Sequence, residues 1–140
     1  MTPAQFPRAF QSYRPQDQKV FGIIAISKDN RILLVKGRER NKWSFPKGHL
    51  QKKETSFDCA LRECYEETGI NYRNIEYESH RKLTSGTYFI YRNIDEEAPL
   101  IQDWNEVCDV AWVSIANMLT MRTNVDVSRF LEVHLDYIEV

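Results

Sequence analysis

Three carboxylates lie close together in the sequence, at spacings that bring side chains to one side of an α-helix. Glu63, Glu66 and Glu67 occupy relative positions i, i+3 and i+4, which fall within about 100° of each other around a helix axis. Like charges at these spacings repel each other and destabilise the helix, so a compensating positive charge is expected. Carboxylates without Cys or His partners are typical of sites for hard cations such as Mg²⁺ and Mn²⁺. The spacing therefore indicates a divalent-metal site.

The residues around these carboxylates have the start, the buried face and the end of a helix. Thr55 is a suitable N-cap, and Gly69 is a natural residue for ending the helix. Apolar and small residues recur at spacings of three and four and predict the buried face: Phe57, Ala60, Leu61, Cys64 and Thr68. Helical geometry then places Glu63 and Glu67 at the border of that face and Glu66 farther toward solvent.

Apolar stretches elsewhere predict a single α/β domain. Residues 19–27 and 31–35 are expected to be strands of a hairpin, joined by a turn at residues 29–30. Further strands are expected at residues 75–83, 87–94 and 107–114, a short helix at 114–121 and an amphipathic helix at 127–138. Residues 1–18 contain three prolines and are interpreted as an N-terminal extension ahead of a domain at residues 19–140.

Composition is typical of a soluble globular protein. The 140 residues are 42% hydrophobic and 28% charged, as in ordinary domains, and no apolar run approaches the length of a membrane span. The odd number of cysteines and the lack of an apolar signal-peptide core favour reduced thiols. We therefore expect a cytoplasmic protein with no membrane association.

Charge is distributed unevenly along the chain. Residues 1–53 contain 12 Lys and Arg against 3 Asp and Glu, a formal charge of +9, and residues 54–140 contain 7 against 17, a formal charge of −10. A basic part joined to an acidic part suits a polyanionic substrate and a cationic cofactor. The basic loop at residues 36–42, with Lys36, Arg38 and Arg40, is a candidate phosphate-binding segment.

The stretch from residue 48 to residue 70 resembles the signature of the Nudix hydrolase family. Every fixed position of that signature is matched here, by Gly48, Glu54, Arg62, Glu63, Glu66, Glu67 and Gly69. Cys64 stands where a larger aliphatic residue is usual. The resemblance implies an α/β/α sandwich with a mixed β-sheet, metal ligation by Gly48, Glu63, Glu66 and Glu67, and catalytic roles for Arg62, Glu66 and Glu67. It further implies that Arg62 orients Glu54 or a neighbouring carboxylate.

Residues outside the signature narrow the resemblance. Glu106 and Trp112 are separated by five residues, a spacing similar to that in decapping and dinucleoside-tetraphosphate branches. Glu106 is therefore the candidate general base, and a glutamate of the signature is the alternative. The run from Trp43 to His49 resembles segments of messenger-RNA decapping Nudix enzymes and of diadenosine tetraphosphate hydrolases. Within this run Lys47 is expected to contact a bridging phosphate. Tyr88 and Trp104 are candidates for stacking on a nucleobase.

These features predict a pyrophosphohydrolase that depends on Mg²⁺ or Mn²⁺. It would cleave a phosphoanhydride bond in a nucleoside-diphosphate-linked substrate. The substrate is expected to be either an RNA 5′ cap or a dinucleoside polyphosphate. Diphosphoinositol polyphosphates also suit the basic part, but the Gly-Gly entry common to that branch is missing. The rival hypothesis is a non-catalytic Nudix module that binds nucleotides or RNA, although such modules usually lose signature carboxylates. No stable protein partner is evident, and the sequence is compatible with a monomer or a homodimer.

Overall fold

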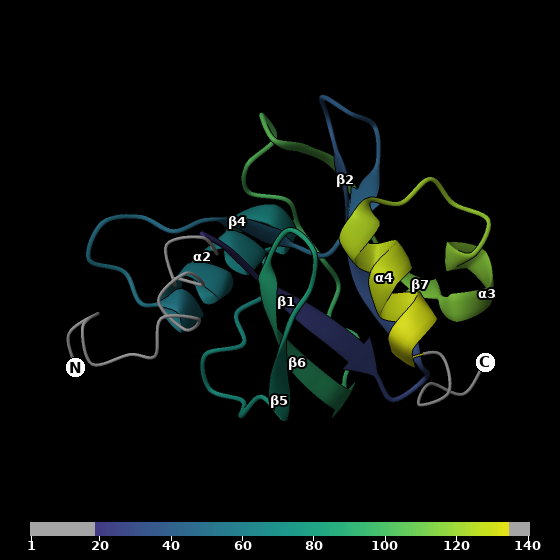
Figure 1. Ribbon diagram of the computed structural model, residues 1–140, viewed down its shortest axis with the longest axis horizontal. Coiled ribbons are helices and arrows are strands. Elements are labelled where there is room, and N and C mark those ends of the chain that lie inside the picture. Colours follow the sequence, from purple (N-terminus) through teal and green to yellow (C-terminus); the bar gives the residue numbers. More distant parts are fainter. Residues whose placement is uncertain (1–18, 135–140) are drawn as a thin grey trace, which may run out of the picture.

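The computed structural model describes residues 19–134, so the N-terminal extension expected at residues 1–18 lies outside the described part. The strands are β1 (Val20–Ser27), β2 (Arg31–Gly37), β3 (Trp43–Ser44), β4 (Lys47–His49), β5 (Ser79–Lys82), β6 (Thr87–Ile94) and β7 (Val107–Ser114). The helices are α2 (Ser56–Thr68), α3 (Ile115–Met118) and α4 (Val125–His134). Figure 1 shows that α2 and α4 lie apart, with the central strands between them.

The strands form one mixed sheet in which β1 is central. The hydrogen-bonded order is β3-β2-β1-β6-β5, with β4 added to β1 and β7 added to β2. β1 and β6 run parallel, whereas the other strand pairs are antiparallel. β1 pairs with β2 only where Ile26 lies opposite Ile32, so the two strands separate toward their other ends.

Residues 43–49 cross between β1 and β2 in the region where these strands have separated. β3 pairs with β2 at Val35 and Lys36, and β4 then pairs with β1, with Lys47 opposite Gly22. Only a glycine fits at position 22, because a Cβ there would collide with the Pro46 carbonyl oxygen and the Lys47 side chain. The crossing places the backbone of β4 against α2, which is the contact on which the candidate site depends.

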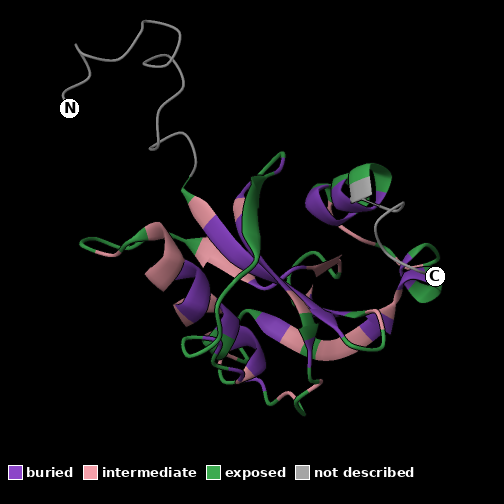
Figure 2. Ribbon diagram, turned by 90° about the horizontal axis from the view of Figure 1, so that it is seen from below, coloured by how far each residue is buried: buried purple, intermediate pink, exposed green. Residues whose placement is uncertain are grey.

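Apolar side chains pack on both faces of the sheet. One buried cluster joins the sheet to α2 through Cys59, Ala60, Leu61 and Cys64, and the other joins it to α3 and α4 through Ile115, Met118, Val127, Phe130 and Leu131. Figure 2 shows the buried residues concentrated in the strands and on the inner sides of the helices. Helices thus cover opposite faces of a mixed sheet, and the predicted α/β/α sandwich is confirmed.

The secondary structure agrees with the sequence-based expectation for most elements. β2 extends two residues farther than predicted and β5 is shorter, since residues 75–78 are not in a strand. β3 and β4 were not predicted. α4 begins two residues earlier than expected, and residues 135–138 of the predicted helix lie outside the described part.

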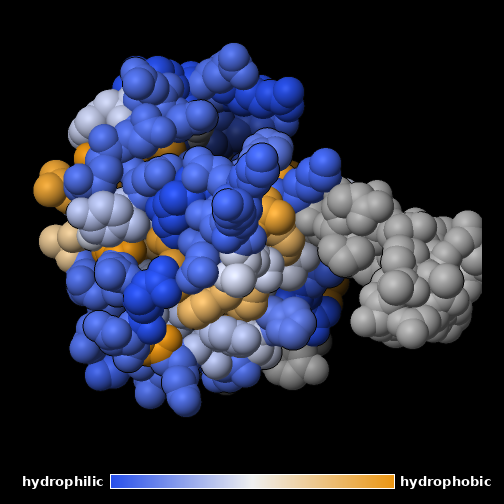
Figure 3. All heavy atoms as spheres, turned by 90° about the vertical axis from the view of Figure 1, so that its left-hand side faces the viewer, coloured by the Kyte–Doolittle hydropathy of each residue, from blue (hydrophilic) through white to orange (hydrophobic). Residues whose placement is uncertain are grey.

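The described surface is mostly polar, with apolar side chains exposed at single positions. Within residues 19–134, no helix has both the length and the apolar character needed to cross a membrane. The face shown in Figure 3 is largely hydrophilic and carries only small, separated hydrophobic areas. Large apolar side chains are exposed at single positions, for example Leu100 and Leu119, which is normal for a folded domain.

Candidate active site

The acidic helix α2 is fixed at both ends by the residues that its sequence indicates. Thr55 is the N-cap, and its hydroxyl accepts a hydrogen bond from the Asp58 amide. Gly69 ends the helix in the left-handed conformation with φ 74°, and its amide donates to the Tyr65 carbonyl. The expected burial order of the glutamates is confirmed: Glu67 is only 9% exposed, and the Glu63 side chain is less exposed than that of Glu66.

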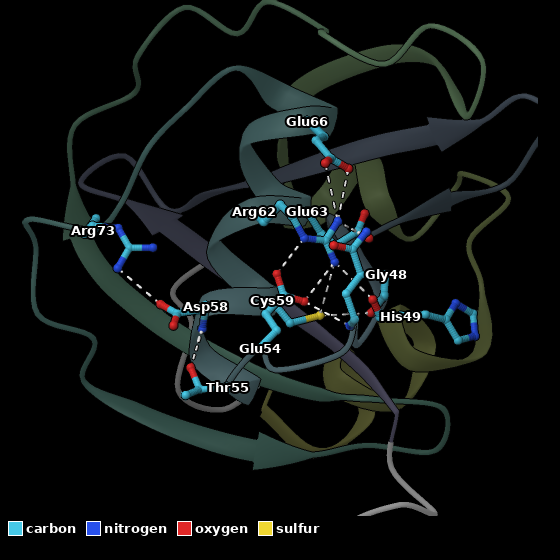
Figure 4. Close-up of polar contacts among 11 residues, drawn as sticks. Gly48, His49, Glu54, Thr55, Asp58, Cys59, Arg62, Glu63, Glu66 and Arg73 are labelled. Atoms are coloured by element: carbon cyan, nitrogen blue, oxygen red, sulfur yellow. Dashed lines mark hydrogen bonds and ion pairs between the residues drawn. The ribbon is translucent and has the colours of Figure 1, made fainter.

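Arg62 is the centre of the polar contacts in the site (Figure 4). Its guanidinium forms a bidentate ion pair with Glu54, with Nε to Oε2 at 2.6 Å and Nη2 to Oε1 at 3.0 Å. Nη1 donates to the Glu63 carboxylate at 3.0 Å and to both Glu66 oxygens at 3.3 Å. Nη2 also donates to the His49 carbonyl at 3.0 Å. The Arg62 guanidinium therefore bonds to three carboxylates and to the end of β4. The expected pairing of Arg62 with Glu54 is observed.

The backbone of β4 makes close contact with the acidic helix. A Cβ at position 48 would collide with the Glu63 carboxylate, so Gly48 lets the main chain approach that side chain directly. The Lys47 amide donates to Glu67 Oε1 at 3.1 Å. The Gly48 carbonyl oxygen faces the Cys59 Sγ at 3.6 Å. Carbonyl and carboxylate oxygens thus gather where β4 meets α2.

Burial makes two of these carboxylates costly to ionise. It raises the pKa of Glu63 to about 7, and the charges of Glu66 and Glu106 add to this rise while Arg62 opposes it. Burial likewise raises the pKa of Glu67 to about 8, against the hydrogen bond from the Lys47 amide. By contrast, the hydrogen bond from Arg62 lowers the pKa of the Glu54 carboxyl.

Glu106 lies within electrostatic reach of the acidic helix, although it is 39 residues or more away in sequence. Its charge contributes to the raised pKa values of both Glu63 and Glu67. The preceding residues are bonded to the end of α2, because the Gln102 and Asp103 amides donate to the Glu66 carbonyl at 3.0 and 2.8 Å. The segment before Glu106 is therefore bonded to the helix that carries the predicted metal ligands.

The donor atoms of the site fit a divalent cation. Within residues 19–134, no three Asp, Glu, His or Cys side chains converge as a ready-made ligand cage. In this structure Arg62 forms ion pairs with Glu54, Glu63 and Glu66. The available donors are nevertheless all oxygens, from Gly48, Glu63, Glu66 and Glu67, which is the chemistry that Mg²⁺ and Mn²⁺ prefer. The lack of a Cβ at Gly48 keeps its backbone in direct contact with the Glu63 carboxylate.

Five of the predicted substrate-binding residues are partly or fully exposed. Lys36 and Lys47 are partly exposed on β2 and β4, and Arg38 and Arg40 are exposed just after β2. Trp104, two residues before Glu106, is 54% exposed, as a stacking residue requires. These positions stay predictions.

The prediction for Tyr88 is wrong. Its side chain is 0% exposed, the ring packs edge-to-face on Phe45 with centroids 5.2 Å apart, and the hydroxyl donates to Asp126 at 2.6 Å. A fully buried ring has no free face for a nucleobase. Tyr88 therefore belongs to the buried cluster that joins the sheet to α3 and α4.

Cys59 is a site residue that sequence reasoning missed. Its Sγ lies 3.6 Å from the Gly48 carbonyl oxygen and 3.9 Å from Arg62 Nη2. Burial raises the pKa of this thiol to about 12, so the group stays protonated. Helical spacing could have placed Cys59 at the site, because this residue precedes Arg62 and Glu63 by three and four residues.

Comparison with known proteins shows the family of the chain. The family model described as "NUDIX domain" matches residues 16–132. The NAD-capped RNA hydrolase NudC of Vibrio parahaemolyticus is 33% identical over 100 residues, which cover 69% of this chain and 38% of the relative. The mRNA-decapping enzyme subunit 2 of Arabidopsis thaliana is 42% identical over 62 residues, covering 44% and 17%. The chain thus spans less than half the length of each of these curated relatives.

Solved structures share the fold at low sequence identity. The Ap4A hydrolase of C. elegans superposes with a TM-score of 0.71 at 18% identity, over 85% of this chain and 97% of the other. The NUDIX domain of Shewanella oneidensis NrtR, complexed with ADP ribose, gives 0.68 at 21% identity over 98% and 99%. With a family model that matches most of its length, this chain belongs to the NUDIX domain family.

Proposed function

We propose that this chain is a divalent-metal-dependent hydrolase that cleaves a phosphoanhydride bond in a nucleoside-diphosphate-linked substrate. The observation that carries the proposal is the contact between β4 and α2, where Gly48, Glu63 and Glu67 meet. This chain keeps all the signature carboxylates, and burial makes Glu63 and Glu67 hard to ionise without nearby positive charge. Both features favour a catalytic site over a module that only binds nucleotides.

The proposal assigns a role to each residue of the site. Gly48, Glu63, Glu66 and Glu67 supply the oxygen ligands. When bound, a divalent cation supplies positive charge that offsets the charge of the phosphates. Arg62 fixes Glu54 and the His49 carbonyl through charge-assisted hydrogen bonds.

Proton transfer and phosphate binding are assigned to residues around the acidic helix. Glu106, which is exposed and within electrostatic reach of Glu63 and Glu67, accepts a proton from the attacking water. Lys47 and the basic residues Lys36 and Arg40 bind phosphates of the substrate. Trp104 stacks on a nucleobase.

An RNA 5′ cap is the first substrate class to test. The curated relatives include proteins named NAD-capped RNA hydrolase, mRNA-decapping enzyme subunit 2 and RNA pyrophosphohydrolase. The basic residues after β2 and in β4 suit the phosphates of such an RNA. A dinucleoside polyphosphate is the second class, because residues 43–49 also resemble diadenosine tetraphosphate hydrolases.

A product-resolved substrate screen tests the proposal. The chain is incubated with Mg²⁺ or Mn²⁺ and capped RNA, diadenosine tetraphosphate, nucleoside triphosphates or diphosphoinositol polyphosphates, and products are separated by chromatography. We expect release of a nucleoside diphosphate from capped RNA, and a loss of turnover of about 10²-fold or more in Glu67→Gln, since one transition-state contact of this kind is worth that much.

Glu76→Gln is the matched control, because Glu76 is exposed outside the site and its variant should keep wild-type turnover. Faster turnover of diadenosine tetraphosphate than of capped RNA would assign the second substrate class. Turnover of diphosphoinositol polyphosphates alone would overturn the nucleotide assignment. Tight nucleotide or RNA binding by a folded protein without any turnover would identify a binding module.

A further inference from the structure

The strand that follows Glu106 contains an irregularity next to the site. In the pairing of β2 with β7, Lys36 lies opposite Asp109 but Gly37 lies opposite Val107. Cys108 therefore has no opposite residue, and β7 carries a one-residue bulge. Bulges bend a strand and redirect the side chains next to them, and they are frequent beside active sites. This bulge lies two residues after Glu106.

Arg38 continues the pairing beyond the bulge and holds the Glu106 segment, which we define as Gln102–Glu106, at two points. Its backbone amide donates to the Glu106 carbonyl at 2.9 Å. Its guanidinium Nε donates to the Trp104 carbonyl at 2.8 Å. The two carbonyls flank Asn105, so one residue fixes the stretch that carries both the candidate base and the candidate stacking residue.

The other end of the Glu106 segment is bonded to the acidic helix. The Gln102 and Asp103 amides both donate to the Glu66 carbonyl. The segment is thus bonded at one end to α2, at a candidate metal ligand, and at the other end to Arg38, just after β2. Movement at the Arg38 end would change the position of Glu106 relative to Glu63 and Glu67, while the Glu66 end would stay in place.

We propose that Arg38 is a positioning residue for Glu106 and not a ligand of the substrate phosphates. The inference rests on the proposed function, in which Glu106 accepts the proton, and it revises the sequence-based role of Arg38. The Arg38 guanidinium donates through Nε to the main-chain carbonyl of Trp104. Hydrogen bonds from charged donors are among the stronger kinds. Phosphate binding then falls to Lys36, Arg40 and Lys47.

A pair of substitutions at position 38 separates positioning from charge. In Arg38→Gln the side-chain amide nitrogen occupies the place of Nε, so a donor to the Trp104 carbonyl is kept while the positive charge is lost. Arg38→Ala removes both. We expect Arg38→Ala to lower kcat by about 10-fold to 100-fold, the worth of one hydrogen bond from a charged donor, with little change in KM. Arg38→Gln should keep kcat near that of the wild type.

Two further variants serve as references for this comparison, one for phosphate binding and one for an exposed arginine outside the site. Arg40→Ala should raise KM and leave kcat unchanged, as expected for a residue that binds phosphate in the ground state and the transition state alike. Arg81→Ala, at an exposed position of β5, should change neither. If both Arg38 variants instead raise KM as Arg40→Ala does, then Arg38 binds phosphate and the inference is wrong.

Double substitution tests whether Arg38 acts through Glu106. Glu106→Gln should lower kcat by about 10²-fold to 10⁴-fold, the usual contribution of a general base. Adding Arg38→Ala to Glu106→Gln should then lower kcat no further, because the positioned group is already lost. Full additivity of the two losses would show that Arg38 acts independently, which contradicts the inference.

Hydrogen exchange provides a readout that does not depend on turnover. Amides of the Glu106 segment should exchange about 10-fold or more faster in Arg38→Ala than in the wild type, since one anchoring hydrogen bond is lost. Arg38→Gln and Arg81→Ala should exchange as the wild type does. Unchanged exchange in Arg38→Ala would overturn the positioning role. A wild-type protein that hydrolyses no substrate would refute the proposed function. Hydrogen exchange would still show whether Arg38 holds the Glu106 segment in place.

Discussion

Gly48 is the residue at which the main chain and the acidic helix come into contact. Any side chain at this position would occupy the space of the Glu63 carboxylate. The residue is therefore required for the geometry of the site and not for a turn, since its φ is not among the positive values in the described chain. Its role is to bring a carbonyl and two carboxylates together.

Gly48→Ala should therefore remove activity while keeping the fold. The added methyl group displaces Glu63, and a misplacement of about 1 Å can lower turnover by about 10²-fold. Gly37→Ala is the matched control, because a Cβ there would meet only the Lys42 carbonyl oxygen at 3.8 Å. The measurements are kcat and a thermal unfolding curve for each variant. Equal turnover in the two alanine variants would show that close approach at Gly48 is unimportant.

Single residues could be predicted from the sequence where their role depends on local spacing. Glu54, Arg62 and Glu63 are close in sequence and form the expected ion pairs. The role of Arg38 could not be predicted, because its partners Trp104 and Glu106 are about 66 residues away and reach it only through the pairing of β2 with β7.

Among the elements, α2 was predicted well because its signals are local. The N-cap, the spacing of the buried residues and the terminal glycine all lie between residues 55 and 69. β3 and β4 have only two and three residues, too few for a recognisable alternation. They exist because β1 and β2 offer bonding edges to the crossing segment, and this is a tertiary effect.

The error at Tyr88 has a related cause. Residues 88–91 of β6 are all buried, because helices cover both faces of the sheet. In such a strand the alternation of inward and outward side chains does not separate buried from exposed residues. The sequence therefore could not show which aromatic residue of this region remains accessible.

α4 is joined to the sheet through a buried carboxylate at its first turn. Asp126 is 0% exposed, and it accepts hydrogen bonds from the Ser85 amide at 2.8 Å and the Tyr88 hydroxyl at 2.6 Å. The contact fixes α4 to the turn between β5 and β6. It also holds Tyr88 under Phe45, which lies within the segment that leads to Lys47.

Asp126→Ala should destabilise the fold by about 2–4 kcal/mol, because the buried Tyr88 hydroxyl and the partly buried Ser85 amide lose their acceptor. Urea unfolding monitored by circular dichroism gives the free energy of unfolding. Glu132→Ala, at an exposed position of the same helix, should stay within about 0.5 kcal/mol of the wild type. A similarly small effect for Asp126→Ala would mean that the buried carboxylate does not hold α4 in place.

At the scale of the whole molecule, the fold brings the basic and acidic parts of the chain together. Lys47 and Arg38 come from the part with a charge of +9, and they lie beside Glu67 and the Glu106 segment from the part with a charge of −10. The signature allowed the family and the fold to be predicted. The substrate could not be predicted, because the groups that select it lie on loops and strand ends that are assembled by tertiary contacts.

In the proposed reaction, oxygens of Gly48, Glu63, Glu66 and Glu67 would hold the divalent cation on which phosphoanhydride cleavage depends. The most direct test measures Mn²⁺ binding and hydrolysis of capped RNA on the same samples of wild-type protein and Glu67→Gln, with Glu76→Gln as control. We predict that the wild type and Glu76→Gln bind Mn²⁺ and lose turnover when it is chelated, and that Glu67→Gln loses both. Wild-type Mn²⁺ affinity in Glu67→Gln, or turnover that survives chelation, would contradict the claim.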